Sequence, residues 1–587
     1  MAPFGKDAHR WWKESIIYQI YPSSFQDSNG DGWGDVKGIT SRLDYLKQLG
    51  IDIVWTSPIY KSPQADMGYD IADYKDVDPM YGSLADVDEL IAELKKRGMK
   101  LMMDLVVNHT SNMHPWFLES RSSKTNPKRD WYIWKPPKAS SEPPNNWAQI
   151  LGEANSAWTY DTETGEYYLS IFTPEQPDLN WENPEVRAAV YDVMHFWMRR
   201  GVSGFRMDVI NMISKDPLFP DADPTIDPSH KYQPGQKYFV NGPRMHEYLQ
   251  EMNREVLSKY DAVTVGEMPG VSDIDEILRT VGSKAGELNM IFIFDVVDID
   301  KPNVRMALKP WDVHVFKRLI SKWQRAMIEH DGWNSVFIEN HDNPRSVSRY
   351  TDDSDQLRDK GAKLLALMQT TLSGTLFVYQ GEEIGIRNAP REWDIETEYK
   401  DIETINYWKK CKALYGDDEE RLAHGRKVIH MKARDHSRTP MQWNSGPNAG
   451  FCTENIKPWM RVMDGYCTIN VEDQMKAQDE RELSVWQFWQ NALLHGKEQK
   501  EVFVYGDFQE TSPEDPSIFA YGRMSESSER WLVVLNFSGT KLGYVLPESL
   551  AMEFWACSNY TKGRVQKSLK GSITLQAWEG VLGKCKG

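Results

Sequence analysis

Short apolar runs rich in β-branched residues recur eight times in the first two thirds of the chain. They are Ser15–Tyr21, Gly50–Ser57, Lys100–Val107, Val202–Met207, Ala262–Gly266, Met290–Phe294, Ser335–Glu339 and Thr375–Tyr379. Segments between them, such as Leu84–Lys96 and Val186–Arg200, place apolar residues at the three-to-four spacing of a helix. Uniformly apolar strands that alternate with helices form a parallel sheet covered on both faces, and eight such units close into a barrel. The sequence therefore predicts an α/β fold with a (β/α)8 TIM barrel.

The chain of 587 residues is too long for one compact core, and three regions depart from the repeat. Residues 110–184, after the third strand, are too long for a structureless loop and predict an inserted subdomain. Residues 380–481 are expected to be irregular, and a helix is expected over Glu482–Lys497. Residues 508–587 alternate short apolar runs with turn residues, which predicts an antiparallel β-domain of the sandwich type. The barrel itself would then span residues 1–109 and 185–507.

The composition narrows the range of partners. A formal net charge of −17 argues against binding to nucleic acid or to an anionic membrane surface. No run approaches the roughly 18 apolar residues of a membrane span, and the start of the chain lacks the apolar stretch of a signal peptide. Five cysteines, all after residue 410, do not suggest a disulfide framework. We expect a cytoplasmic monomer whose substrate is a small neutral molecule, and the 23 tryptophans suit the flat faces of sugars.

Carboxylates stand at the carboxyl ends of three predicted strands, at Asp208, Glu267 and Asp342. In a barrel of this kind, strand ends of the same polarity face one active-site mouth. Cleavage of a glycosidic bond needs one carboxylate at the anomeric carbon and a second, protonated one at the leaving oxygen. Arg206, two residues before Asp208, would keep Asp208 ionised and leave the proton on Glu267.

These strand ends belong to motifs that resemble the α-amylase family, glycoside hydrolase family 13, and the resemblance covers nearly the whole chain. The motifs stand in the family's order at Asp104–His109, Gly204–Asp208, Val265–Pro269 and Ile338–Asp342. Gln176–Trp181 resembles the signature of the branch that contains oligo-1,6-glucosidases and fungal maltases and isomaltases. The resemblance implies a retaining, exo-acting α-glucosidase that releases terminal glucose from short oligosaccharides. It implies that Asp208 is the nucleophile, Glu267 the general acid/base and Asp342 the carboxylate that holds the sugar hydroxyls.

The same resemblance implies a set of glucose-binding residues. His109, Arg206 and His341 match the family's sugar-binding positions, and Asp66 and Tyr69 match its pocket-closing segment. The arginine partner of Asp66 lies within residues 434–443, where Arg438 is favoured and the spacing leaves Arg434 open. Phe172 is a candidate aromatic wall of the pocket.

Val209, directly after the proposed nucleophile, bears on linkage preference. In the branch that this chain resembles, valine at this position accompanies α-1,6 preference. A β-branched side chain is stiff about its first torsion and would narrow the entrance where the second sugar lies. Isomaltose is therefore expected to be favoured over maltose.

An acidic loop after the first strand predicts a metal site. Oxygen ligands alternate around glycines at Asp27, Asn29, Asp31, Trp33 and Asp35, a pattern that suits Ca²⁺. The loop is not an EF-hand, because Gly38 stands where that motif requires a bidentate glutamate. The family resemblance implies structural Ca²⁺, or Mg²⁺, and the alternative is a loop of Asx turns without a metal. No organic cofactor is expected.

Several other functions share this scaffold. A maltase or sucrase-type α-1,4-glucosidase is the main alternative, and sucrose isomerases and trehalose-6-phosphate hydrolases are further ones. The isomerases have an arginine-rich loop near the third carboxylate, from which Arg345–Tyr350 departs. A non-catalytic subunit of amino-acid transporters would lack the three carboxylates and would carry a membrane span.

Overall fold

The computed structural model of this chain describes residues 9–152, 155–301, 306–563 and 565–586, so the first eight residues assigned to the barrel lie outside it. Eight parallel strands form one sheet in the order β11-β10-β9-β5-β2-β1-β13-β12. A parallel bridge between Ile291 and Asn334 joins the two ends of this order, so the sheet forms a barrel. Each predicted run overlaps one strand: β1 (Ile16–Ile20), β2 (Ile53–Thr56), β5 (Lys100–Val106), β9 (Gly204–Asp208), β10 (Val263–Glu267), β11 (Met290–Phe292), β12 (Ser335–Val336) and β13 (Thr375–Tyr379). The predicted (β/α)8 barrel is confirmed.

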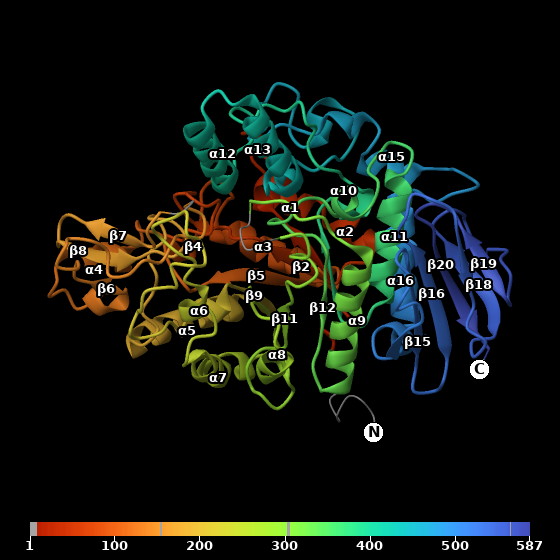
Figure 1. Ribbon diagram of the computed structural model, residues 1–587, viewed down its shortest axis with the longest axis horizontal. Helices are drawn as coiled ribbons and strands as arrows, with labels where there is room; N and C mark the ends of the chain where they lie inside the picture. Colours follow the sequence, from red (N-terminus) through yellow and green to blue (C-terminus); the bar gives the residue numbers. More distant parts are fainter. Residues whose placement is uncertain (1–8, 153–154, 302–305, 564, 587) are drawn as a thin grey trace.

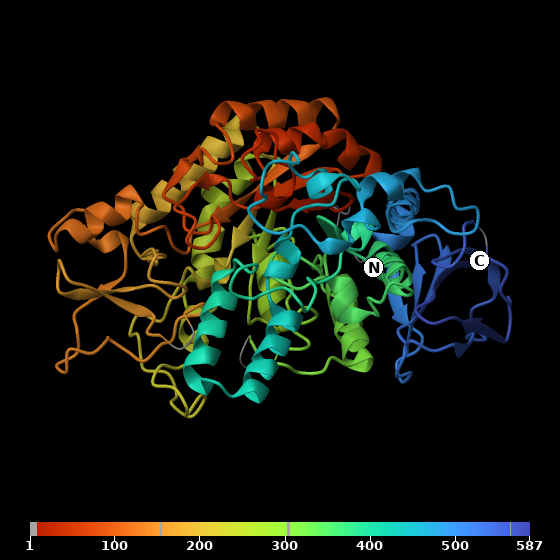
Figure 2. The same cartoon turned by 90° about the horizontal axis from the view of Figure 1, so that it is seen from above.

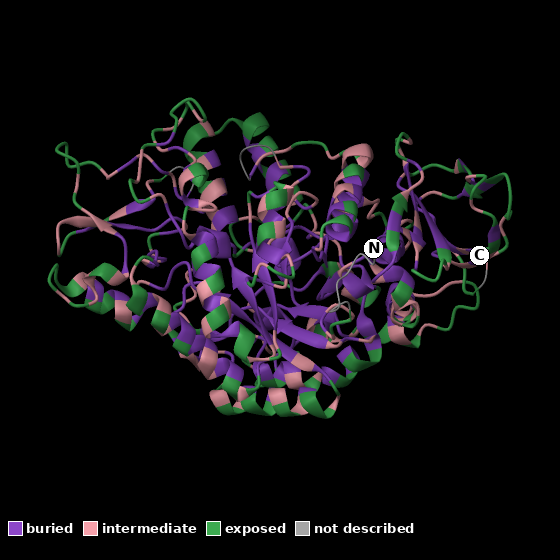
Figure 3. Cartoon of the chain, turned by 90° about the horizontal axis from the view of Figure 1, so that it is seen from below, coloured by how far each residue is buried: buried purple, intermediate pink, exposed green. Residues whose placement is uncertain are grey.

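The barrel strands are buried on both faces, which explains why their sequences are apolar throughout (Figure 3). Helices begin where side chains can satisfy free backbone N–H groups. Ser83 and Asp86 form a capping box at the start of α3, and Asn183 caps α5 ahead of a proline. The helices around the barrel are α1 (Val36–Ser41), α2 (Leu43–Leu49), α3 (Leu84–Lys96), α5 (Pro184–Arg200), α7 (Met245–Glu255), α8 (Ile274–Val281), α9 (Val313–Glu329), α10 (Ser346–Tyr350) and α11 (Arg358–Thr371).

The segment between β5 and α5 projects from one side of the barrel (Figure 1). It contains α4 (Pro115–Ser122) and an antiparallel sheet of β6 (Trp134–Lys135), β8 (Glu166–Leu169) and β7 (Trp158–Asp161). Its own apolar cluster includes Trp147, Trp158 and Leu169, and reaches Val209 and Met212 from the loop after β9. The inserted segment therefore packs directly against the barrel mouth.

The C-terminal region is an antiparallel β-domain on the opposite side of the barrel (Figure 1), as predicted. A five-stranded sheet and a strand pair enclose an apolar cluster that contains Leu532, Trp555 and Leu575. Helices α11 and α16 (Val485–Glu498) lie between this domain and the barrel. The strands are β14 (Asp507–Glu510), β15 (Ile518–Met524), β16 (Arg530–Asn536), β17 (Leu542–Val545), β18 (Met552–Ser558), β19 (Ser572–Leu575) and β20 (Gly580–Cys585).

Residues 380–481 correct one sequence-based expectation, because their middle part is helical rather than irregular. Helices α12 (Ile402–Tyr415) and α13 (Glu419–Lys432) form a hairpin that stands above the barrel mouth (Figures 1 and 2). Asp401 and Asp418 cap their first turns, and Gly416 lies in the short connection between them. Helix α13 is mostly exposed and α12 is partly buried, and both bury few apolar residues, so the apolar period from which helices are predicted is weak here. The short helices α14 (Asp435–Arg438) and α15 (Val471–Lys476) follow.

Candidate active site

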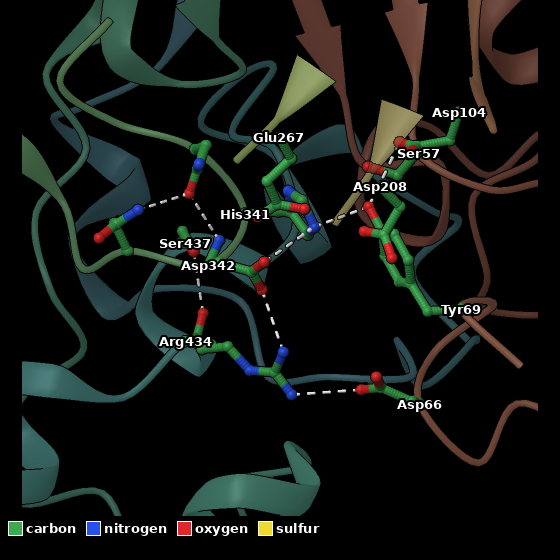
Figure 4. A network of polar contacts seen from close by, with 12 residues as sticks. Ser57, Asp66, Tyr69, Asp104, Asp208, Glu267, His341, Asp342, Arg434 and Ser437 are labelled. Carbon is green, nitrogen blue, oxygen red and sulfur yellow. Dashed lines mark hydrogen bonds and ion pairs between the residues drawn. The ribbon is translucent and has the colours of Figure 1, made fainter. Parts of the chain in front are cut away.

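The three predicted carboxylates lie together at the carboxyl end of the barrel (Figure 4). Asp208 is the last residue of β9, Glu267 is the last residue of β10, and Asp342 follows β12. Asp208 and Glu267 are buried, whereas the Asp342 side chain is 22% exposed. The parallel strands thus deliver all three acids to one pocket, as the strand ends predict.

One buried guanidinium, that of Arg206, connects three carboxylates beneath the pocket. Its Nη1 donates to Asp104 at 2.6 Å and to Asp208 at 2.8 Å, and its Nη2 donates to Glu267. Burial raises the pKa of Asp104 to about 6, although the charge of Arg206 opposes this shift. In the sequence Asp104 stands out only as the start of a motif, because its place in this network depends on its position opposite Arg206 in the neighbouring strand, β9.

The same network determines the protonation of Asp208. Burial is the largest cause that raises its pKa well above the ordinary value. Arg206 lowers this pKa, whereas the charges of Glu267 and Asp104 and a hydrogen bond with Glu267 raise it. Arg206 thus favours the ionised form of Asp208, in the direction expected from the sequence, and it acts against burial and two neighbouring carboxylates.

The far end of the pocket is a chain of alternating charges (Figure 4). Asp66 binds Arg434 at 3.2 Å, and Arg434 binds Asp342 at 3.1 Å. Arg438 donates to Asp342 at 2.7 Å, and both arginines also bind Asp401, at 2.7 and 2.9 Å. The partner of Asp66 is therefore Arg434, and not the Arg438 that the sequence favoured. Arg438 contacts the third carboxylate instead.

Two neutral histidines, His341 and His109, contact Tyr69, the aromatic wall of the pocket. The Tyr69 hydroxyl lies 2.7 Å from His341 Nε2, and the two rings stack with centroids 5.3 Å apart. Gln19 Nε2 lies 2.8 Å from the other ring nitrogen of His341. Burial lowers the pKa of His341 to about 3 and that of His109 to about 4, so both rings are uncharged near neutral pH. His109 Nε2 contacts the Tyr69 carbonyl at 3.0 Å.

Gln176 is a pocket residue that sequence reasoning used only as part of a signature. Its Nε2 lies 3.2 Å from Asp66 Oδ2, 3.3 Å from the Tyr69 carbonyl and 3.2 Å from His109 Nε2. Gln176 is fully buried, so these contacts take place away from water. Its position as the first residue of the branch signature could have indicated a functional role. Its contacts with Asp66 and His109, however, depend on the tertiary fold.

Phe172 and Val209 lie beside this pocket, on the side of the inserted segment. The Phe172 ring is partly buried, with its centroid 5.1 Å from that of His109. The Val209 backbone is left-handed, at φ 34° and ψ 43°, which is strained for a β-branched residue. Its N–H lies 3.2 Å from Glu267 Oε2, so this conformation directs a donor at the predicted acid/base.

The acidic loop at residues 27–35 folds around its own carboxylates. Asp27 accepts N–H groups from Asn29, Gly30 and Gly32, and Asp31 accepts that of Trp33. Within the described residues, no three His, Cys, Asp or Glu side chains group closely enough to hold a metal by themselves. A site here would need the Asn29 amide and the Trp33 carbonyl as well, and these oxygens with the remaining carboxylate lone pairs suit a hard cation. The metal site stays a prediction.

Comparisons with known proteins agree with this geometry. The model of the alpha-amylase catalytic domain matches residues 19–506. The chain belongs to the alpha-amylase family. Within this family it is 47% identical to an alpha-glucosidase of Schizosaccharomyces pombe over 99% of both chains, and 48% identical to an oligo-1,6-glucosidase of Parageobacillus thermoglucosidasius over 97% of this chain and 98% of that protein. Its structure resembles the crystal structure of an isomaltulose synthase from Klebsiella, with a TM-score of 0.91 and 40% identity over 99% of this chain and all of that one.

Proposed function

We propose that this member of the alpha-amylase family is a retaining, exo-acting α-glucosidase that releases terminal glucose from short oligosaccharides. The observation that carries the proposal is that Asp208 and Glu267 bind the same guanidinium, that of Arg206, at the ends of two neighbouring strands. Inverting glycosidases separate their carboxylates by roughly 6.5–9.5 Å to admit a water molecule, whereas retaining ones keep them closer. Two carboxylates that share one guanidinium are held close together, which supports the second group.

The reaction follows from these positions. Asp208 attacks the anomeric carbon, while Glu267 transfers its proton to the glycosidic oxygen and the aglycone leaves. The resulting glucosyl ester on Asp208 is then attacked by water, which Glu267 deprotonates, and Asp208 is released. Two displacements at one carbon restore its configuration. Arg206 contacts both acids and stabilises the negative charge of whichever one is ionised.

The alternating charges of Asp66, Arg434 and Asp342 support exo action. They close the end of the pocket opposite the catalytic pair, and Gln176 and Tyr69 fill the remaining space around Asp66. A wall of paired charges at this end favours binding of the terminal glucose of the substrate. Its hydroxyls would be held by Asp66 and Asp342 in charge-assisted hydrogen bonds.

Within α-glucosidases, Val209 and the oligo-1,6-glucosidase relatives support a preference for α-1,6 linkages. A maltase-type α-1,4-glucosidase is the alternative within the same mechanism. An isomerase is less well supported, because the arginines after the third carboxylate are buried and engaged. Arg345 binds Glu339, and Arg349 binds Asp300. Neither arginine is available to steer a released sugar back to the glucosyl-enzyme.

Substrate comparison tests this proposal. The purified protein is incubated with isomaltose, maltose, sucrose and trehalose 6-phosphate, and glucose release and product anomers are followed by NMR. We expect isomaltose to be cleaved with the highest kcat/KM and α-glucose to form first. Initial release of β-glucose would refute retention, and no release from any substrate would refute the glucosidase. Isomaltulose as the main product from sucrose would favour the isomerase.

We further propose that the loop at residues 27–35 holds a structural Ca²⁺, or Mg²⁺, outside the glucose pocket. The loop packs on a distant segment of the barrel domain, since Asp27 N–H donates to the Phe451 carbonyl at 3.1 Å and Trp33 stacks on Trp459. An ion bound by its oxygens would stabilise this junction without taking part in catalysis.

We also propose that the enzyme works as a monomer in the reducing cytoplasm. No disulfide joins the five cysteines, all of which lie in the described part of the chain. Among the described residues, no helix is long and apolar enough to cross a bilayer. Sedimentation under reducing conditions tests the oligomeric state, and a stable dimer would contradict it.

A further inference from the structure

Arg345 lies under the glucose pocket with its side chain fully buried. It follows Asp342 by three residues, in the turn that leads into α10. Its guanidinium does not reach the sugar-binding surface. Every contact that it makes goes instead to a segment that supports that surface.

The contacts of Arg345 join three separate parts of the barrel mouth. Nη1 donates to Glu339 at 2.7 Å and to the Gln380 carbonyl, after β13, at 2.7 Å. Nε and Nη2 donate to the carbonyls of His436 and Ser437 in α14, each at 3.2 Å. The second carboxylate oxygen of Glu339 accepts the backbone N–H of Ser346 at 2.7 Å.

Two of these three parts, the Glu339 segment and the α14 turn, lead to the charged end of the pocket. Glu339 begins the segment that leads to Asp342. The α14 carbonyls belong to the turn that holds Arg434 and Arg438, and both of these arginines bind Asp342. A single buried cation therefore sets the distance between the third carboxylate and its two arginine partners.

We propose that Arg345 is a positioning residue for glucose recognition. It acts through Asp342, Arg434 and Arg438, and through Arg434 it also orients Asp66. This inference rests on the proposed α-glucosidase function, in which these four side chains bind the terminal glucose. Asp208 and Glu267, at the ends of β9 and β10, make no contact with Arg345. Arg345 therefore affects their reaction only by helping to place the sugar.

The chain offers a matched control for a merely structural role. Arg523 in β15 is also buried, and its guanidinium donates to the carbonyls of Thr371, Gly506 and Asp507 at 2.6–3.0 Å. It joins the C-terminal domain to α11 and has no contact with the pocket. Loss of either guanidinium leaves buried carbonyls without donors, so both losses should lower stability.

The test compares Arg345→Met, Arg345→Lys and Arg523→Met with the wild type. Melting temperature, kcat and KM for 4-nitrophenyl α-glucoside, and the inhibition constant of 1-deoxynojirimycin, a glucose-shaped amine, are measured for each. We expect Arg345→Met to raise both KM and the inhibition constant at least tenfold. Arg345→Lys, which can keep the ion pair with Glu339, should fall between it and the wild type. Arg523→Met should lose melting temperature while KM and the inhibition constant stay within twofold.

The outcomes separate this inference from the function on which it rests. A wild type that does not hydrolyse the glucoside refutes the proposed function. An active wild type whose Arg345 variants keep wild-type KM and inhibition constant refutes the positioning role. If Arg345→Met does not fold, the Arg345→Lys variant tests the positioning role. If Arg345 were purely structural, this variant would have a lower melting temperature and an unchanged affinity for the inhibitor.

Discussion

Replacement of Val209 by threonine tests the proposed linkage preference. Threonine has nearly the shape of valine and the same branching, so the left-handed backbone at φ 34° and its N–H toward Glu267 stay comparable. The entrance keeps its width, and one methyl group becomes a hydroxyl at the wall where the second sugar enters, so the variant tests the apolar character of this wall rather than its width. An apolar group of this size contributes about 0.8 kcal/mol to an apolar contact, which corresponds to about fourfold in relative kcat/KM. We therefore expect the ratio of kcat/KM for maltose to that for isomaltose to rise about fourfold.

The assay measures initial glucose release from each disaccharide by the same enzyme preparation, so any loss of folded protein cancels in the ratio. A hydroxyl in the apolar cluster around Val209 should cost about 1–3 kcal/mol of stability. Val190→Thr is the matched control, because Val190 is equally buried but lies in α5, outside the pocket. It should lower stability and leave the ratio unchanged. An unchanged ratio in Val209→Thr would refute the reasoning and would assign discrimination to the inserted segment.

Three further predictions address catalysis, the metal and pH. Asp208→Asn and Glu267→Gln should each fold and lose more than about 1,000-fold in turnover, and more than a tenth of wild-type activity in either would contradict its role. A chelator should lower the melting temperature by several degrees and change activity at moderate temperature little, whereas an unchanged melting temperature would contradict the metal site at residues 27–35. Burial lowers the pKa of His114 from 6.5 to about 3, so the unfolded chain takes up the proton first and stability is lost as pH falls below 6.5. The His114→Asn variant keeps an acceptor for the Trp116 N–H. In urea titrations between pH 7 and pH 5, the unfolding free energy of the wild type should fall by about 2 kcal/mol more than that of this variant. Equal falls would contradict the lowered pKa.

Much of the fold and the identity of the three acids could be predicted from the sequence, because both depend on local patterns. Each barrel strand is a short run that is apolar on both faces, and β9 and β10 end directly on Asp208 and Glu267. Parallel strands bring equivalent ends to the same side, so strand ends alone place these residues in one pocket. The helices α12 and α13 could not be predicted, because their stability comes from caps and partial packing rather than from a strong apolar period.

Only the tertiary structure decided how the charges in the pocket are paired. Arg434 and Arg438 are four residues apart at the two ends of one helical turn, so they share a face and the sequence does not distinguish them. The loop that carries Asp66 approaches the Arg434 side of this turn, and that approach is set by chain segments more than 360 residues apart. The raised pKa of Asp208 likewise depends on burial, and on a guanidinium divided among three carboxylates. Pairing of buried charges depends on distances between loops in space, which no local pattern of residues encodes.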